Sequence, residues 1–538
     1  MITQNITTTI TGAKAIIEAL KNLNVDTVFG YPGGVVVDIY DELYKDNSIK
    51  HILTRHEQSA VHAAEGYARA TNKCGVVIVT SGPGATNTIT GIVNAYIDGY
   101  PLIILTGQVS NNLIGTNAFQ EANICDMVKT CTKAAFQITS AKDIQDTLYL
   151  AHKIATSGKK GPVVIDLVKD IFKETVQLTN KINTFENDEN KITTSDLTAL
   201  ETAITNSNKP LIVAGGGVKH SQAEYTLLNI VKKTNIPVVS TMMGLGTFPQ
   251  DNSNYFGMIG VFGDNSANQL LTESDLVISL GARFNDKITK RNELNGKLFQ
   301  IDINPDEISK NVKTDKFIIG DINDILKKIR INKDFSGWSK ICQTLKISNK
   351  KQEKTTNLLH SFEVIQAIEN YTKDKNITFT SEVGQHQLWT VKNLRFNNKN
   401  RKIFVSGGTG TMGFGLPAAI GASVADKSNC VVCITGDGSF QMSLHELATC
   451  KENNLNIKIM ILNNGYLGMV RQIQEKQCGC RYSQTKISSP DFVALAKSYG
   501  INAIKVNNYN EIKPALDMAF SNNDTFIIDF SIEPMEIL

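Results

Sequence analysis

Short apolar runs that end in small polar turns constrain the fold of this chain most strongly. Near the C-terminal end, Val431 to Ile434 leads into Gly436-Asp437-Gly438, and Ile457 to Leu462 ends at Asn463-Asn464. Runs of this length, rich in Val and Ile and separated by helical patterns, are typical of buried strands in parallel sheets. Comparable runs recur at residues 27–29, 75–79, 102–105, 163–166, 211–213, 276–279, 298–302, 377–379 and 526–530. The sequence therefore predicts an α/β fold with helices on both faces of parallel sheets.

Two polar stretches divide the chain. Residues 179–196 and 347–357 lack apolar periodicity and are predicted to be linkers. We expect three doubly wound parallel-sheet domains, at residues 1–180, 190–345 and 358–538. The first and third segments are similar in size and pattern, which is compatible with a duplication.

Composition excludes several classes of function. The net charge is +3 and 20% of the residues are charged, so neither a nucleic-acid partner nor a membrane surface is expected. No apolar run reaches the roughly 18 residues that a membrane span needs. The N-terminus resembles neither a secretory signal nor an Arg-rich transit peptide, and nine scattered Cys residues suit a reducing compartment. We therefore expect a cytoplasmic enzyme.

The Gly-Asp-Gly turn and the paired Asn suggest a specific chemistry. Asp437 and Asn464 offer oxygen ligands of the kind that Mg²⁺ prefers. The glycines beside Asp437 let backbone amides approach a phosphate. Each motif follows a predicted strand, and 24 residues separate Gly438 from Asn463. This pattern indicates a Mg²⁺-bridged diphosphate site, and the alternative is two surface turns after core strands.

Gly-Asp-Gly followed by Asn-Asn resembles the signature of thiamine diphosphate (ThDP) enzymes, and further blocks narrow the resemblance. Glu57 lies in Arg55-His56-Glu57-Gln58, after the Gly-rich turn Tyr31-Pro32-Gly33-Gly34. Over nearly all its length the chain resembles the catalytic subunits of acetolactate synthases. The matching blocks also include residues 80–87 (TSGPGATN), 115–121 (GTNAFQE), 384–389 (GQHQLW), 412–419 (MGFGLPAA) and 467–472 (LGMVRQ). The resemblance implies a pyrimidine-binding domain, a central FAD-type domain and a diphosphate-binding domain.

The resemblance also implies roles for individual positions. Asp437, Asn464 and the Tyr466 carbonyl would bind Mg²⁺. Glu57 would activate the pyrimidine ring of ThDP, and Met412 would support the bent cofactor. The other positions expected at the cofactor are Gly33, Gly34, Gln385, His386, Gly438, Ser439 and Met469. Those expected on the substrate side are Phe119, Gln120 and Lys169, whose ammonium group would attract a 2-oxoacid carboxylate. The alternatives are core packing for Phe119 and Met412 and a solvated charge for Lys169.

The central segment resembles the flavin-binding domain of the same family. Gly215-Gly216-Gly217 follows a predicted strand, and Arg283 and Asp302 fall where the family has its FAD loops. The resemblance implies a structural FAD that does no net redox chemistry. An empty or ADP-binding domain is the alternative.

Several positions depart from the family pattern, and most of them concern the acceptor substrate. Ile473 replaces a Trp that favours 2-oxobutyrate as acceptor, Lys287 replaces an Arg, and Val35 replaces an Ala. A Lys presents a point charge where an Arg would offer a bidentate fork. The chain also stops at Leu538, short of most of the Pro-rich tail that helps to close the family's active site.

The expected function is decarboxylation of pyruvate and transfer of its two-carbon unit to a second 2-oxoacid, which gives 2-acetolactate for branched-chain amino-acid biosynthesis. One alternative is a related carboligase with another acceptor, such as a keto-sugar nucleotide. A pyruvate oxidase or decarboxylase is another, and a non-catalytic binding protein is a third. The resemblance also implies a homodimer or homotetramer, with ThDP between domains of two subunits, and a small regulatory subunit as a partner.

Overall fold

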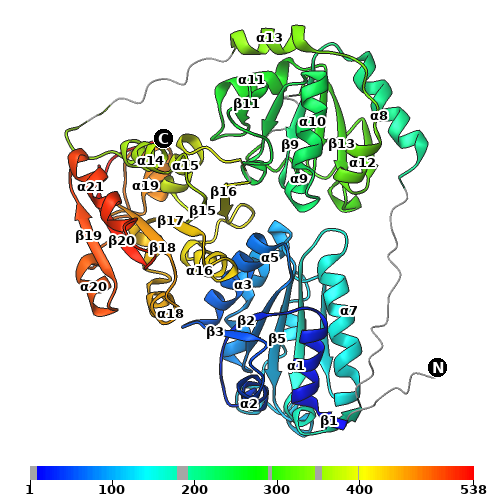
Figure 1. Ribbon diagram of the computed structural model, residues 1–538, viewed down its shortest axis with the longest axis vertical. Helices are drawn as coiled ribbons and strands as arrows, with labels where there is room; N and C mark the ends of the chain where they lie inside the picture. Colours follow the sequence, from blue (N-terminus) through cyan, green and yellow to red (C-terminus); the bar gives the residue numbers. More distant parts are fainter. Residues whose placement is uncertain (1–8, 178–191, 289–293, 346–353, 355, 398) are drawn as a thin grey trace. The chain divides into compact units, whose positions relative to one another are not determined.

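The computed structural model describes residues 9–177, 192–288, 294–345, 354, 356–397 and 399–538. These residues form three six-stranded sheets flanked by helices, together with a two-stranded antiparallel sheet of β1 (Thr9–Thr11) and β8 (Thr175–Gln177) (Figure 1). One compact unit contains the N-terminal sheet and most of the C-terminal sheet, and a second contains the central sheet together with residues 388–403. The predicted α/β class with three parallel sheets is confirmed.

The N-terminal sheet forms from the apolar runs in the first third of the chain. Its strand order is β3-β2-β4-β5-β7-β6, and all neighbouring strands are parallel. Every residue of β4, β5 and β7 is buried, as expected for strands covered by helices on both faces. The strands are β2 (Thr27–Tyr31), β3 (Lys50–Leu53), β4 (Gly75–Val79), β5 (Leu102–Gln108), β6 (Ala134–Ile138) and β7 (Pro162–Val168). The helices of four or more residues are α1 (Gly12–Asn22), α2 (Val37–Lys45), α3 (Glu57–Thr71), α4 (Pro83–Thr86), α5 (Ile89–Asp98), α6 (Ile124–Met127), α7 (Ile144–Thr156) and the 3₁₀ helix η3 (Lys169–Phe172).

The C-terminal sheet repeats the topology of the N-terminal one. Its order is β16-β15-β17-β18-β20-β19, so both sheets read 2-1-3-4-6-5 when their strands are numbered along the chain. Ligands of such open sheets bind where the order reverses, beyond the carboxyl ends of the first and third strands. The strands are β15 (Ile377–Ser381), β16 (Arg401–Val405), β17 (Cys430–Gly436), β18 (Ile457–Asn463), β19 (Asn502–Val506) and β20 (Phe526–Ser531). The helices of this third of the chain are α14 (Ser361–Thr372), α15 (Gln385–Asn393), α16 (Gly415–Ala425), α17 (Asp437–Phe440), α18 (Leu447–Glu452), α19 (Gly468–Gln477), α20 (Phe492–Ser498), α21 (Tyr509–Ala519) and the 3₁₀ helix η7 (Leu444–Glu446).

The central sheet has a different topology, with the order β11-β10-β9-β12-β13-β14. Numbered along the chain this is 3-2-1-4-5-6, the order of dinucleotide-binding folds, and it reverses between β9 and β12. The strands are β9 (Pro210–Ala214), β10 (Val238–Ser240), β11 (Tyr255–Met258), β12 (Leu276–Leu280), β13 (Lys297–Asp302) and β14 (Lys316–Ile319). The helices of four or more residues are α8 (Thr194–Asn206), α9 (Gly216–His220), α10 (Glu224–Thr234), α11 (Asn265–Glu273), α12 (Ile322–Lys328) and α13 (Ser336–Leu345).

The structure describes only the ends of the two predicted linkers. Thr193 caps α8 in a capping box with Asp196, so the helix begins inside the linker predicted for residues 179–196. The predicted C-terminal end of this linker is wrong. The first turn of α8 is polar, and the apolar residues that mark the helix in the sequence follow only after that turn. Residues 178–191, and most of the linker predicted for 347–357, lie outside the described residues.

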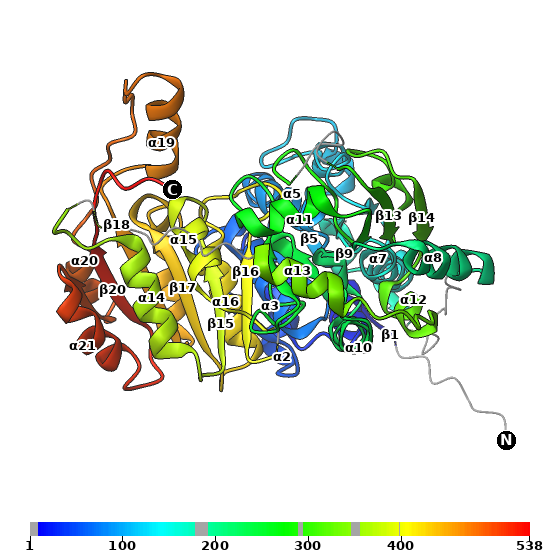
Figure 2. The same ribbon diagram turned by 90° about the horizontal axis from the view of Figure 1, so that it is seen from above.

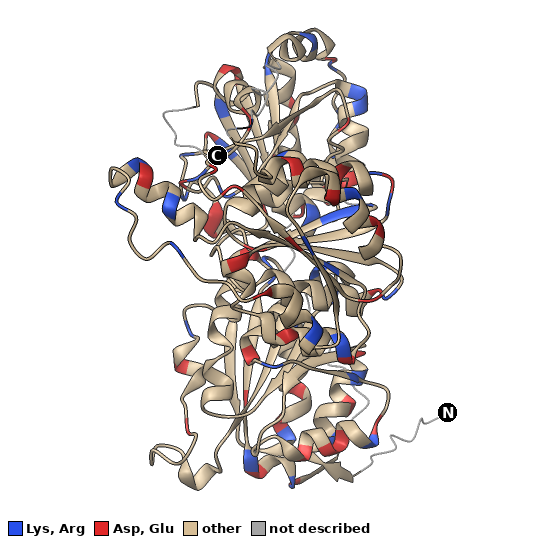
Figure 3. Cartoon of the chain, turned by 90° about the vertical axis from the view of Figure 1, so that its left-hand side faces the viewer, with Lys and Arg blue, Asp and Glu red and all other residues tan. Residues whose placement is uncertain are grey.

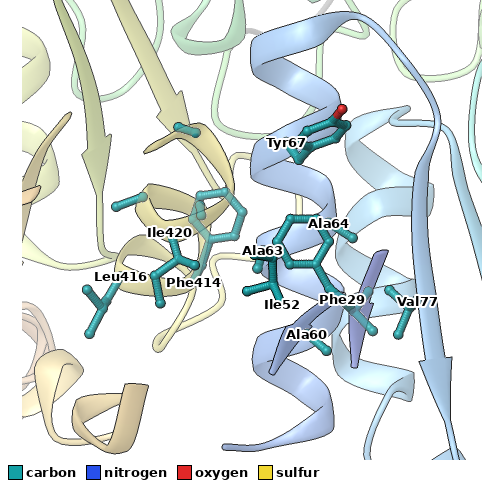
Figure 4. Packing of buried hydrophobic residues seen from close by; sticks show 14 of the residues in the cluster. Phe29, Ile52, Ala60, Ala63, Ala64, Tyr67, Val77, Phe414, Leu416 and Ile420 are labelled. Carbon is teal, nitrogen blue, oxygen red and sulfur yellow. The ribbon is translucent and has the colours of Figure 1, made fainter. Parts of the chain in front are cut away.

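Two helices made largely of small residues join the N-terminal and C-terminal sheets within their unit. α3 and α16 pack against each other, with Ala63 on the side of α3 toward Phe414, Leu416 and Ile420, and with Ala64 on the side toward Val77 of the N-terminal sheet (Figure 4). A Cβ atom on Gly66 would lie 2.2 Å from the Ala418 carbonyl oxygen, and one on Gly421 would lie 1.9 Å from the Ala63 carbonyl oxygen. The glycines therefore let the two backbones approach to a distance that no side chain would permit.

The surface carries charges of both signs. Basic and acidic residues are interspersed over the side that Figure 3 shows. In the described parts of the chain, no helix is long and apolar enough to cross a membrane.

Candidate active site

The structure brings the Gly-Asp-Gly turn and the paired Asn together. Asp437 begins α17 directly after β17, and its side chain is buried. Its carboxylate accepts a hydrogen bond from the Ser489 hydroxyl at 2.9 Å, and the backbone N–H groups of Asn464 and Gly465 lie close enough to favour its negative charge. Burial raises the pKa of this carboxyl, and these neighbouring donors oppose the shift. Since β17 and β18 are adjacent parallel strands, the two motifs meet at one edge of the sheet.

The two Asn residues differ in what they do. The Asn463 side chain donates to Asp529 at 3.0 Å and so belongs to the sheet. Asn464 lies in the loop and accepts from the Tyr466 backbone N–H at 3.0 Å. Asp437, Asn464 and the Tyr466 carbonyl are all oxygen donors, which suits Mg²⁺. The described residues contain no group of three or more His, Cys, Asp and Glu side chains that could hold a metal, and this donor set needs only one of them.

Helix N-termini gather around this edge. α15, α17 and α19 begin after β15, β17 and β18 respectively, and their first backbone N–H groups are natural partners for a phosphate. Figure 2 shows α19 projecting from the C-terminal sheet. This helix carries Met469 and Ile473, two of the predicted site residues.

The glycines of the region make room for two side chains that the sequence assigns to the cofactor. A Cβ atom on Gly436 would lie 2.9 Å from Nδ1 of His386, and one on Gly468 would lie 2.1 Å from Oε1 of Gln385. Burial lowers the pKa of His386 to about 4, so its ring is neutral near pH 7. The Gln385 amide donates to Gln472 at 2.7 Å and to the Glu536 carbonyl at 3.0 Å, which ties it to α19 and to the C-terminal tail.

The side chain of Ser439 is also used within the fold, since its hydroxyl donates to the Val383 carbonyl at 3.1 Å. Gly438 lies against Leu467 and Ile487, where a Cβ atom would meet side-chain carbons at 2.9 and 3.1 Å. The backbone N–H groups of Gly438 and Ser439, rather than the Ser439 hydroxyl, are therefore the better candidates for contact with a diphosphate.

Met412 lies on a turn that a buried carboxylate holds. Glu382, at the end of β15, accepts from the backbone N–H groups of Gly413 at 2.8 Å and Gly415 at 2.7 Å. Gly413 has a φ of +90°, a conformation that side chains rarely adopt, so the turn needs a glycine there. Sequence reasoning missed Glu382, because its partners are backbone groups about thirty residues away and no local pattern marks them.

Glu57 is the first residue of α3 and faces the loop after β4. The Asn87 side-chain amide donates to its Oε2 at 2.9 Å. A Cβ atom on Gly84 would lie 3.5 Å from its Oε1. The predicted Gly33 contacts the same loop, where a Cβ atom would lie 2.5 Å from that of Thr80, while Gly34 has open space around it. The Tyr31–Gly34 turn, the 80–87 loop and Glu57 thus meet at the carboxyl edge of the N-terminal sheet.

The substrate-side residues lie on loops at the same edge of that sheet. Glu121 organises the loop of residues 115–121 by accepting from the backbone N–H groups of Gly115 and Ala118. Gln120 has a φ of +61° and lies against Gly82, and the Phe119 side chain is 88% exposed in the single chain. Lys169 begins η3 directly after β7 and is exposed.

The central domain presents its predicted loops at the reversal point between β9 and β12. Gly215 and Gly217 pack on Gly281, whose backbone atoms would lie 2.1 and 2.7 Å from the added Cβ atoms. These two glycines therefore serve the packing of the two turns, while Gly216 is less crowded. Arg283 follows Gly281 on the second turn, and Asp302 ends β13, where its carboxylate accepts from the Asn304 N–H at 3.0 Å.

The residues assigned to the acceptor lie on three separate elements. Val35 packs on Gly107 beside α2, where an added Cβ atom would lie 2.8 Å from its Cγ1. Ile473 lies on α19 and is 44% exposed. Lys287 forms an exposed ion pair with Asp286 at 2.7 Å in the central domain.

Comparison with known proteins agrees with the three sheets. The thiamine pyrophosphate enzyme N-terminal TPP binding domain matches residues 10–128, the central domain matches 197–329, and the C-terminal TPP binding domain matches 382–530. The acetolactate synthase large subunit of Haemophilus influenzae is 39% identical, over 98% of this chain and 95% of that protein. A probable acetolactate synthase large subunit of Methanocaldococcus jannaschii is 41% identical, over 98% and 93%. The isozyme 2 large subunit of Escherichia coli is 37% identical, over 98% and 96%. With this identity along its whole length and a TPP-binding domain at each end, the chain belongs to the acetolactate synthase large-subunit family of thiamine pyrophosphate enzymes.

Proposed function

We propose that this chain forms 2-acetolactate by decarboxylating pyruvate and transferring the two-carbon unit to a second 2-oxoacid. The observation that carries the proposal is the meeting of Asp437 with the Asn464–Gly465 turn, in a chain that matches acetolactate synthase large subunits over 98% of its length. Bound ThDP would supply the carbanion chemistry that releases CO₂ and carries the remaining two carbons. The alternatives with another acceptor or with an oxidase reaction are not favoured.

The residues of the chain would divide the work as follows. Asp437, Asn464 and the Tyr466 carbonyl would hold Mg²⁺ against the diphosphate. The neutral ring of His386 and the backbone N–H groups at the starts of α15 and α17 would hold the phosphate oxygens, and Met412 would support the cofactor.

Glu57 would exchange a proton with the pyrimidine ring. Asn87 fixes the orientation of its carboxylate by donating to Oε2 at 2.9 Å. Removal of a positioned acid–base group typically costs about 10²–10⁴ in rate. Phe119, Gln120 and Lys169 would form the substrate side, where Lys169 would attract the carboxylate of the 2-oxoacid.

The assembly belongs to the same proposal. Phe119, Leu113, Ile114 and Val37 are exposed apolar residues on loops and a helix at the carboxyl edge of the N-terminal sheet. Such a surface is typical of an interface, and a homodimer or homotetramer would cover it and complete the site. The relatives are named large subunits, which supports association with a small regulatory subunit. FAD in the central domain and a cytoplasmic location complete the proposal.

The test is incubation of the purified protein with pyruvate, ThDP and Mg²⁺, followed by product analysis. Acetolactate from pyruvate alone is the expected product, and Glu57→Gln is expected to lose at least about a hundredfold in rate. A flavin absorbance spectrum of the same preparation tests for FAD. Acetaldehyde or acetate as the main product, or a two-carbon transfer only when a different acceptor such as a keto-sugar nucleotide is added, would refute acetolactate synthesis.

A further inference from the structure

A buried polar cluster joins the C-terminal domain to the start of the helix that carries Glu57. Glu446 ends η7, and its side chain is fully buried. The backbone N–H of Arg55 donates to its Oε1 at 2.8 Å, and the Thr449 hydroxyl donates to its Oε2 at 2.6 Å. The Ser59 hydroxyl and the His56 backbone N–H lie close enough to favour the negative charge of this carboxylate.

The contacts reach both sides of the turn between β3 and α3. The Thr449 hydroxyl also lies 3.0 Å from the Leu53 carbonyl oxygen at the end of β3, so its one proton is shared between that oxygen and Glu446. Arg55 lies two residues before α3, and the helix itself is capped by His56, whose Nδ1 accepts from the Gln58 backbone N–H at 3.1 Å. Glu446, almost four hundred positions away in the chain, accepts from the backbone of the turn that leads into this cap, near a helix N-terminus where a negative charge is favourable.

A second carboxylate touches the same turn in a different way. Glu452, at the end of α18, forms an ion pair with the Arg55 guanidinium, and its side chain is half exposed. This pair holds a side chain at the surface, whereas Glu446 holds the backbone. Arg55 is therefore held in two independent ways. Glu452 pairs with its side chain at the surface, and Glu446 accepts from its backbone N–H in the interior.

We propose that Glu446 is a positioning residue for Glu57, acting through the backbone of Arg55 and His56. The proposal rests on the proton-transfer role proposed for Glu57. Asn87 orients the end of the Glu57 side chain, but the position of its Cα atom depends on the turn that precedes it. Proton transfer is sensitive to displacements of about 1 Å, so loosening the turn would slow turnover while the cofactor could still bind.

The direct test is amide hydrogen exchange of the peptide around residues 54–58, measured without cofactor. Glu446→Ala is expected to raise exchange at Arg55 and His56 by about tenfold or more, since the buried Arg55 N–H loses its acceptor and the turn loosens. Glu446→Gln keeps one oxygen acceptor and is expected to give a smaller change. Glu452→Gln is the matched control, because Glu452 lies at the opposite end of α18 from Glu446 and contacts the same Arg55. It is expected to leave this exchange within twofold, since surface ion pairs contribute little.

Kinetics and binding add the functional readout. In Glu446→Ala, kcat is expected to fall about ten- to a hundredfold, with the dissociation constant for ThDP changed less than threefold. Glu446→Gln is expected to recover part of kcat. In the Glu57→Gln background, Glu446→Ala is expected to add no further loss, because both changes act on one proton transfer.

The outcomes separate the two proposals. If Glu57→Gln keeps its activity, the role of Glu57 is wrong, while the exchange data still decide whether Glu446 holds the turn. Unchanged amide exchange in Glu446→Ala would show that Glu446 does not hold the turn. If the two single losses in kcat multiply in the double variant, Glu446 does not act through Glu57. Should Glu446→Ala fail to fold, Glu446→Gln and Thr449→Val carry the same comparison, since both weaken the cluster without leaving a large cavity.

Discussion

The packing of α3 on α16 gives a sharp prediction at Gly421. In Gly421→Ala, the new Cβ atom would lie 1.9 Å from the Ala63 carbonyl oxygen and 2.6 Å from the Tyr67 backbone nitrogen, whereas ordinary contacts begin at 3.4 Å. Both neighbours are backbone atoms, so no side chain can rotate away. The helices would have to separate locally by roughly 1.5 Å, and overpacking of this kind typically costs about 1–3 kcal/mol.

Helix propensity works in the opposite direction, since Ala in a helix interior is favoured over Gly by about 1 kcal/mol. Placing the steric cost at the upper end, because the clash is with backbone, leaves a net loss of about 2 kcal/mol. For the unit that contains both helices, the midpoint of thermal unfolding should fall by about 3 °C. Activity should fall as well, since α3 begins with Glu57 and α16 follows the Met412 turn.

The matched control is Gly337→Ala in α13. An added Cβ atom there meets nothing within 4 Å, so the same change should be neutral or slightly stabilising. Differential scanning calorimetry on both variants and the unmodified protein decides the question. A Gly421→Ala protein that unfolds at the same temperature as the unmodified one, or a Gly337→Ala protein that loses as much, would refute the reasoning.

Three further predictions concern the site. Asp437→Ala should abolish Mg²⁺-dependent ThDP binding, because the diphosphate loses its metal bridge; unchanged ThDP affinity in a fluorescence titration would contradict this role. Ile473→Trp should raise the preference for 2-oxobutyrate over pyruvate as acceptor about tenfold or more, with Lys287→Arg improving acceptor affinity; a strong 2-oxobutyrate preference in the unmodified protein, seen in competition assays, would defeat this argument. Burial raises the pKa of Glu382 from 4.5 to about 7, so the folded protein holds this proton more tightly than the unfolded chain. Its contribution to stability is full below pH 4.5 and is lost as pH rises through about 7. The free energy of unfolding, measured by chemical denaturation between pH 4.5 and 8, should therefore fall less steeply with pH in Glu382→Gln than in the unmodified protein. The same dependence on pH in both proteins would refute the pKa assigned to Glu382.

Strand cores could be predicted from the sequence because burial on both faces leaves continuous apolar runs. β4 was expected and is found at Gly75–Val79. Strand ends were less predictable where polar residues are buried inside the sheet. β5 continues to Gln108 and β7 to Val168, beyond the apolar runs, because the Gln108 amide donates to the buried Asp166 carboxylate at 3.0 Å.

The site shows the same division between local and distant signals. Asp437 and Asn464 could be paired from the sequence, because each follows a strand and parallel strands end at one edge. The roles of Glu382 and Glu446 could not be predicted, because their partners are backbone N–H groups of segments far along the chain. Almost every residue type has a backbone N–H, so the sequence does not reveal which of these groups is the donor. Gly215 and Gly217 were expected to make room for a ligand, and the structure shows that each also makes room for Gly281.

The shared strand order of the N-terminal and C-terminal sheets bears on the history of the molecule. The third strand is followed by Asp437-Gly438 in the C-terminal sheet and by Thr80-Ser81-Gly82 in the N-terminal sheet. The position after the third strand thus holds the proposed metal ligand Asp437 in one domain and only small residues, beside Glu57, in the other. Duplication of a single ancestral module, followed by division of labour between the copies, would account for this pattern. On the proposed mechanism neither present-day copy would retain a complete reaction centre, so natural selection would act on the pair as one heritable unit.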